Sequence, residues 1–117
     1  FKDYYNKVLE AQKLGVSLVK AGVAAKDIDL AVRSKLESFG LADYFAHGTG
    51  HGIGLEIHEI PSISLRSDII LQENMVITIE PGIYIRGWGG IRIEDTVIVK
   101  ANTCEVITHA DKELLIL

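Results

Sequence analysis

Three histidines and two glutamates are the residues of this sequence whose type and placement could support chemistry. His47, His51 and His58 lie in one short glycine-rich stretch, Glu80 ends a run that is mostly apolar, and Glu94 is flanked by isoleucine and valine. A carboxylate among buried strands is costly unless it is paired or binds a cation. An imidazole with two carboxylates is a suitable ligand set for Mn, Co, Fe or Zn, so a divalent metal site is one interpretation of this pattern.

Each of these residues also has an ordinary structural interpretation. A histidine taken singly is more often a surface or hydrogen-bonded core residue than a ligand. Glu94 could simply pair with Arg92, two positions away on the same strand face, and Glu80 could begin a turn with Pro81 and Gly82. The alternating glycines could mark only tight packing between strands. Spacing alone leaves these interpretations and the metal site open.

Two helices are expected before these residues. Apolar positions at helical spacing predict a helix from Tyr4 to about Lys20. A second helix is expected to run to about Phe39, with Asp27 as its N-cap. Gly40 stands where a helix C-terminus favours a residue in the left-handed region.

Strands are expected to carry the residues that could bind a metal. The segment His47–Gly54 has glycine at every second position, which favours an extended backbone over a helix. Pro61 is expected to end that segment, and residues 62–74 are expected to form a loop. The alternating pattern predicts strands at Met75–Glu80, Ile91–Lys100 and Glu105–His109. The whole pattern therefore predicts an α+β fold, with two N-terminal helices followed by an antiparallel sheet.

The length and composition exclude several classes of protein. A chain of 117 residues, with 48% hydrophobic and 24% charged residues, fits one small globular domain. The net charge of −4 without a basic run argues against a nucleic-acid partner or an anionic membrane surface. No apolar run approaches the roughly 20 residues that a membrane span needs. The single cysteine excludes a disulfide framework and fits a cytoplasmic location.

Three strings of residues resemble the C-terminal signatures of the pita-bread metallopeptidases. They are HGTGHGIGLEIHE at 47–59, ITIEPGIY at 77–84 and GGIRIEDTVIV at 89–99, and they occur in the expected order. The family contains Xaa-Pro dipeptidases, Xaa-Pro aminopeptidases and methionine aminopeptidases, and the strings are more similar to the proline-specific branch. The resemblance therefore implies metal-dependent hydrolysis of small peptides that have proline in the second position.

The resemblance also implies which residues would bind metal. His51, Glu80 and Glu94 would be ligands of a site for two divalent ions. Glu80 would bind one ion and also carry a proton in catalysis, and Glu94 would bridge both ions. Asp95, next to Glu94, would be structural only.

The same resemblance implies a substrate side of the site. His47 and His58 would be catalytic and substrate-binding residues, because they would stabilise the substrate's carbonyl oxygen as it becomes negative. Arg92 would join them in the substrate-binding group by orienting Glu94 or a hydrogen-bond relay.

Members of the family use further residues that have no counterpart in this chain. Two aspartate ligands and one more substrate histidine come from segments before the first helix. The chain also starts at Phe1, inside a helical pattern and without a methionine. We therefore expect residues 1–117 to be the C-terminal part of a catalytic domain, the second half of a pita-bread fold, with an incomplete metal site and no activity alone.

A half-fold would leave apolar surface exposed. We therefore expect a homodimer that forms through the sheet, with Met75–Ile79 or Ile91–Val99 as an unpaired edge. A methionine aminopeptidase and a non-catalytic binding module that lacks metal are the alternatives. The presence of all three ligands, His51, Glu80 and Glu94, favours an enzyme over the binding module.

Overall fold

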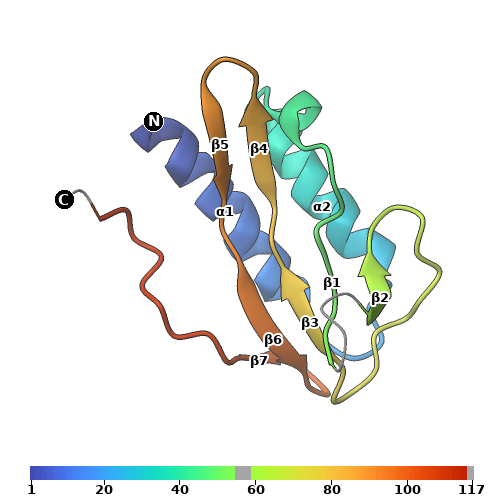
Figure 1. The fold of residues 1–117 in the computed structure, drawn as a ribbon. Coiled ribbons are helices and arrows are strands. Elements are labelled where there is room, and N and C mark those ends of the chain that lie inside the picture. Colours follow the sequence, from blue (N-terminus) through green and yellow to red (C-terminus); the bar gives the residue numbers. More distant parts are fainter. Residues whose placement is uncertain (55–58, 116–117) are drawn as a thin grey trace.

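The computed structural model describes residues 1–54 and 59–115 and shows two helices packed on one face of an antiparallel sheet (Figure 1). Helix α1 spans Lys2–Leu18 and helix α2 spans Ala25–Ser38, and a short 3-10 helix, η1, follows at Ala42–Tyr44. The expected α+β architecture is confirmed. No helix within the described part of the chain is long and apolar enough to cross a membrane.

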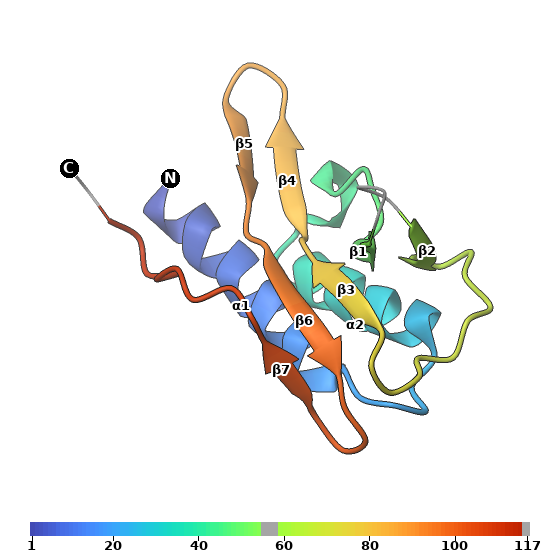
Figure 2. The same ribbon diagram turned by 60° about the horizontal axis from the view of Figure 1, so that its bottom comes forward.

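Seven strands follow the helices within the described residues. They are β1 Gly50–Gly52, β2 Glu59–Ile63, β3 Val76–Ile79, β4 Gly82–Ile85, β5 Gly89–Arg92, β6 Asp95–Val99 and β7 Cys104–Val106. Five of them form an antiparallel sheet in the order β2-β1-β3-β6-β7, and β4 and β5 form a separate ribbon. Figure 2 shows that this ribbon continues directly from β3 and β6.

Strands β3 to β6 together form one long hairpin that is interrupted near its middle. In the sheet, Ile79 of β3 lies opposite Asp95 of β6, and in the ribbon Gly82 of β4 lies opposite Arg92 of β5. Both pairings share one register, so the interruption in one arm of the hairpin faces the interruption in the other.

Two apolar clusters join the helices to the sheet and the ribbon. In the first cluster, buried side chains of both helices pack with β4 and β5. In the second cluster, buried side chains of α2 and partly buried side chains of α1 pack with β2, β3 and β6. Ile77 and Ile79 of β3 belong to the second cluster and are fully buried. Because side chains alternate along a strand, Thr78 and Glu80 are directed to the face opposite the helices. The helices therefore support the sheet from one side and leave the other side to the polar residues.

The boundaries of helix α2 correct one expectation and confirm another. The helix begins at Ala25, so Asp27 lies in its first turn and is not the N-cap. An acidic residue there still interacts favourably with the helix dipole. Gly40 follows the helix with φ of 73°, and the amides of Gly40 and Leu41 donate to carbonyls of the last turn. This is a Schellman motif, as the position of the glycine predicted.

The sheet corrects four further expectations. Pro61 lies inside β2 instead of ending a segment, so the loop begins only after Ile63. The strand expected at Ile91–Lys100 is two strands, because β5 pairs with β4 whereas β6 pairs with β3 and β7. Strand β4 was not expected. Strands β3 and β6 are interior strands, so Met75–Ile79 and the β6 part of Ile91–Val99 are not edges of the sheet. Among the described strands, the edges are β2 and β7.

Candidate metal centre

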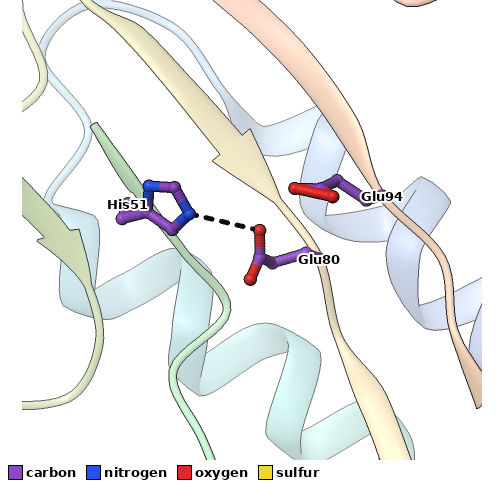
Figure 3. A group of neighbouring side chains, drawn as sticks. All are labelled: His51, Glu80 and Glu94. Carbon is purple, nitrogen blue, oxygen red and sulfur yellow. Dashed lines mark ion pairs between the residues drawn. The ribbon is translucent and has the colours of Figure 1, made fainter. Parts of the chain in front are cut away.

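The hairpin interruption brings two glutamates together. The register shared by its two arms places Glu80 opposite Glu94. Strand β1 lies on the other side of β3 and presents His51 towards the same point. One nitrogen of His51 and one oxygen of each glutamate lie within 4.8 Å of one another (Figure 3). The expected convergence of these three side chains is confirmed.

The ring of His51 is oriented by the backbone. Its Nδ1 lies 2.9 Å from the carbonyl oxygen of Gly52, and because a carbonyl only accepts, Nδ1 carries the hydrogen. Its Nε2 lies 3.4 Å from Oε2 of Glu80, an ion pair when the ring is protonated (dashed line in Figure 3). In the neutral ring Nε2 instead holds a lone pair that could bind a metal. The backbone N–H of His51 donates to Oγ1 of Thr78 at 3.1 Å. A histidine that ligates a metal typically has its second nitrogen fixed in this way.

The two carboxylates strongly affect each other's ionisation. The hydrogen bond with Glu80, burial and the negative charge of Glu80 together raise the pKa of Glu94 to about 7. Burial also raises the pKa of Glu80, but hydrogen bonds with Glu94 and Thr78 and the charges of His51 and Arg92 outweigh it, so the pKa of Glu80 is lowered. The pair therefore holds one shared proton on Glu94 up to about neutral pH.

The donor set fits a divalent cation. Two ionised carboxylates that face each other are unfavourable, and a cation between them removes this repulsion. Donors at roughly 2.0–2.2 Å from one ion lie within about 4.4 Å of one another. Small rotations of His51, Glu80 and Glu94 would therefore bring their donor atoms, now within 4.8 Å, onto a common ion. Three protein donors leave coordination positions for further ligands.

His47 lies beside the ribbon that continues from Glu80. Its Nδ1 is 2.7 Å from the carbonyl oxygen of Gly48, and its Nε2 is 3.0 Å from the hydroxyl of Tyr84 on β4. Both ring nitrogens therefore have protein partners. Tyr84 was not among the residues predicted from the sequence, although strand alternation from Glu80 would have placed it on the same face.

Arg92 and His58 complete the substrate-binding group expected from the sequence. The side chain of Arg92 is exposed, and its charge lowers the pKa of both Glu80 and Glu94, so it acts on the pair electrostatically. His58 lies outside the described residues, so its position in the site stays a prediction.

Asp95 connects the site to its support. Its carboxylate is buried and accepts hydrogen bonds from Nε2 of Gln12 at 2.8 Å and from Oγ1 of Thr108 at 2.5 Å. Nζ of Lys112 lies 3.0 Å from the same carboxylate. These contacts join β6 to helix α1 and to the segment after β7, which fits the structural role expected for Asp95.

Known proteins resemble this chain over most of its length. A family model described as metallopeptidase family M24 matches residues 1–101. The Xaa-Pro dipeptidase of Pyrococcus furiosus is 50% identical over 114 residues, which are 97% of this chain and 33% of that protein. Among solved structures, an Xaa-Pro dipeptidase from Bacillus anthracis is 52% identical, with a TM-score of 0.97. The match covers 99% of this chain and 33% of the chain of that dipeptidase. An X-Pro aminopeptidase from Thermotoga maritima is 46% identical with a TM-score of 0.92, over 95% of this chain and 32% of its own. The chain thus spans about a third of the length of these relatives.

Proposed function

Because the chain belongs to metallopeptidase family M24 and shares the pita-bread fold of the prolidases, we propose that it is part of a metal-dependent Xaa-Pro dipeptidase or aminopeptidase. Residues 1–117 would form the C-terminal part of the catalytic domain. The reaction is hydrolysis of the peptide bond between the first residue of a small peptide and a proline in the second position. The convergence of His51, Glu80 and Glu94 is the observation that carries this proposal.

His51, Glu80 and Glu94 would hold two divalent ions, Mn, Co, Fe or Zn, with Glu94 shared between them and with further ligands from other residues. Such ions polarise the substrate's carbonyl and acidify a water molecule. Glu80 accepts the proton of the attacking water and passes it to the leaving nitrogen of proline. Hydrogen bonds with Glu94 and Thr78 lower the pKa of Glu80, so its carboxylate is ionised at neutral pH and is available to bind a cation.

His47, His58 and Arg92 would act on the substrate. His47 and His58 stabilise the carbonyl oxygen as negative charge develops on it, and Arg92 orients Glu94. Proline has no amide hydrogen, so its recognition rests on the shape of its ring and on its carbonyl. The position of His47 beside Tyr84, on the ribbon that continues from Glu80, supports its part in this arrangement.

The proposal is tested with the full-length protein, stripped of metal and then supplied with Mn²⁺ or Co²⁺. We expect metal-dependent hydrolysis of Leu-Pro and a loss of at least about 100-fold in kcat for Glu80→Gln. Glu105→Gln, which changes an exposed glutamate on β7, is the matched control and keeps wild-type activity. Faster hydrolysis of Met-Ala than of Leu-Pro would instead identify a methionine aminopeptidase. Absence of both metal binding and turnover would identify a non-catalytic binding module.

We also propose a cytoplasmic homodimer that acts on small peptides and binds neither nucleic acid nor membranes. The free thiol of Cys104 supports a reducing compartment. The net charge of −4, without a basic run in the sequence, supports the lack of a nucleic-acid or membrane partner. Exposed apolar side chains on and after β2, such as Ile60 and Ile70, support self-association.

A further inference from the structure

Two residues of helix α2 lie outside the metal centre but contact the segment that leads into it. Asp29 and Arg33 are one helical turn apart, and Nε of Arg33 donates to Oδ2 of Asp29 at 2.8 Å. The side chain of Asp29 is fully buried, and that of Arg33 is 27% exposed. The other hydrogen bonds of these two side chains are made with every second residue of the segment 45–49, namely Phe45, His47 and Thr49.

Arg33 holds the first part of this segment. Its Nη1 donates to the carbonyl oxygen of Phe45 at 3.0 Å, and its Nη2 donates to the carbonyl oxygen of His47 at 2.6 Å. The guanidinium carbon also lies 4.3 Å from the centre of the Phe45 ring. The same ring meets the imidazole of His47 nearly at right angles, with 5.1 Å between ring centres. Arg33 therefore constrains both the backbone and the ring position of His47.

Asp29 holds the second part of the segment. Its Oδ1 accepts hydrogen bonds from the backbone N–H of Thr49 at 3.0 Å and from the Thr49 hydroxyl at 2.7 Å. The carbonyl oxygen of Thr49 in turn accepts the backbone N–H of Glu80 at 2.6 Å. Thr49 thus connects the buried carboxylate of α2 to the backbone of the glutamate at the metal centre.

Stability alone is a weak reason for a charged pair at this position. The cost of removing two charges from water often exceeds their attraction, and an apolar pair of similar volume is commonly as stable. An apolar pair could not distinguish the carbonyls of residues 45 and 47 from the amide of residue 49. The guanidinium of arginine can donate to two carbonyl oxygens at once, and the carboxylate of aspartate can accept from arginine with one oxygen and from an amide with the other. The pair therefore matches two carbonyls followed by an amide.

We propose that Asp29 and Arg33 are positioning residues that determine where His47 and, through Thr49, Glu80 lie. The inference rests on the proposed function for its effect on catalysis. Its geometric part concerns the segment 45–49 and can be tested without activity.

The kinetic test uses the full-length protein with Mn²⁺ and Leu-Pro. Arg33→Lys keeps the charge but loses the fork, so we expect kcat to fall about 10- to 100-fold. KM should change less than about threefold, because His47 acts on the charge that develops in the transition state. The control is Ile28→Val, or Ile28→Ala if that better matches the unfolding temperature of Arg33→Lys. Ile28 is buried on the same helix but packs in the cluster with Ile77 and Ile79, and its variant should keep kcat within about twofold.

A spectroscopic test uses the metal-free protein labelled uniformly with ¹⁵N, so that both histidine ring nitrogens and backbone amides are observed. Arg33→Lys should shift the ring nitrogen signals of His47 and raise amide exchange at Thr49 and Glu80 at least about tenfold. The Ile28 control should do neither. Thr49→Val removes the hydroxyl bond to Asp29 and should raise the exchange of Glu80, whereas Thr49→Ser should restore it.

The outcomes separate this inference from the proposed function. If the wild type is active and Arg33→Lys matches the Ile28 control in kcat and in the His47 signals, the positioning role is wrong. If the wild type has no activity, the proposed function fails. The His47 signals and the exchange at Glu80 then still support or overturn the positioning of the segment.

Discussion

Glu80 and Glu94 face each other across the hairpin, and the metal-free protein lets them share a proton. The hydrogen bond with Glu80 and burial raise the pKa of Glu94 to about 7 in the folded protein, from 4.5 ordinarily. Between these values the folded protein binds the proton more tightly than the unfolded chain. The contribution of Glu94 to stability is therefore fully present below pH 4.5 and is lost as the pH rises through about 7.

A metal ion must displace the shared proton, so metal affinity should rise with pH. We expect Mn²⁺ to bind about tenfold more weakly at pH 6 than at pH 8, because Glu94 with a pKa of about 7 is mostly protonated at pH 6. Isothermal titration calorimetry in buffers of different ionisation enthalpy should show close to one proton released per site at pH 6. An affinity that is independent of pH, with no proton release, would contradict the shared proton.

Residue type marks His51, Glu80 and Glu94 as candidates, and the family resemblance adds that they would be ligands of one site, whereas the residues that support them could not be predicted. A glutamate among valines and isoleucines is conspicuous because burying it is costly. Asp29 and Arg33 look in sequence like an ordinary i,i+4 pair on a helix. Their partners Phe45, His47 and Thr49 follow only from the tertiary fold, which local spacing does not encode.

The interrupted hairpin is the element that creates the site. The alternation from Ile91 to Val99 continues through the interruption, so the sequence predicted one strand where the structure has two. The two strands differ in the strands with which they pair. Pro81, between β3 and β4, has no N–H to donate to the neighbouring strand, and the β4–β5 ribbon extends beyond the five-stranded sheet. The turn around Gly87 nevertheless fixes the register, and a register drawn from that turn would have placed Glu80 opposite Glu94.

Gly50 allows β1 to approach β3, as the alternating glycines suggested. A Cβ atom on Gly50 would lie 1.7 Å from the carbonyl oxygen of Thr78, which is an impossible contact. We expect Gly50→Ala to push β1 away from β3, to displace His51 and to weaken Mn²⁺ binding at least about tenfold. Titration calorimetry together with urea denaturation of the full-length protein measures both effects.

Gly40→Ala is the control for this prediction. Gly40 has φ of 73° and no atom within 4 Å of an added Cβ. Its substitution should cost about 1–2 kcal/mol of stability through backbone strain and should leave Mn²⁺ affinity unchanged. Wild-type affinity in Gly50→Ala, or an equal loss in Gly40→Ala, would show that the β1–β3 approach does not position His51.

At the scale of the whole molecule, the helices occupy one face of the sheet and the candidate metal centre lies on the other. The described residues bring three donors to that face, and the relatives are about three times as long as this chain. We expect the 117-residue chain, produced alone, to show no hydrolysis of Leu-Pro with Mn²⁺ or Co²⁺, because most coordination positions would be filled by water. Turnover that disappears in Glu80→Gln would contradict this expectation.

The same chain, produced alone, should self-associate through side chains on and after β2. Among the described strands, β2 pairs only with β1, and Ile60 on it is 87% exposed, followed along the chain by Leu65 and Ile70 at 51% and 50%. Pro61 removes one backbone donor from this edge, so we expect apolar contacts to contribute more than strand pairing.

Light scattering at micromolar concentration should therefore give about twice the monomer mass of 12.8 kDa. Ile60→Lys combined with Ile70→Lys should restore the monomer, because each places a charge on the associating surface. Leu30→Lys is the matched control, since Leu30 is 54% exposed but lies on helix α2, and it should leave the mass of the wild-type dimer unchanged. A monomeric wild type, or a Leu30 variant that dissociates as fully as the double variant, would exclude this surface as the interface.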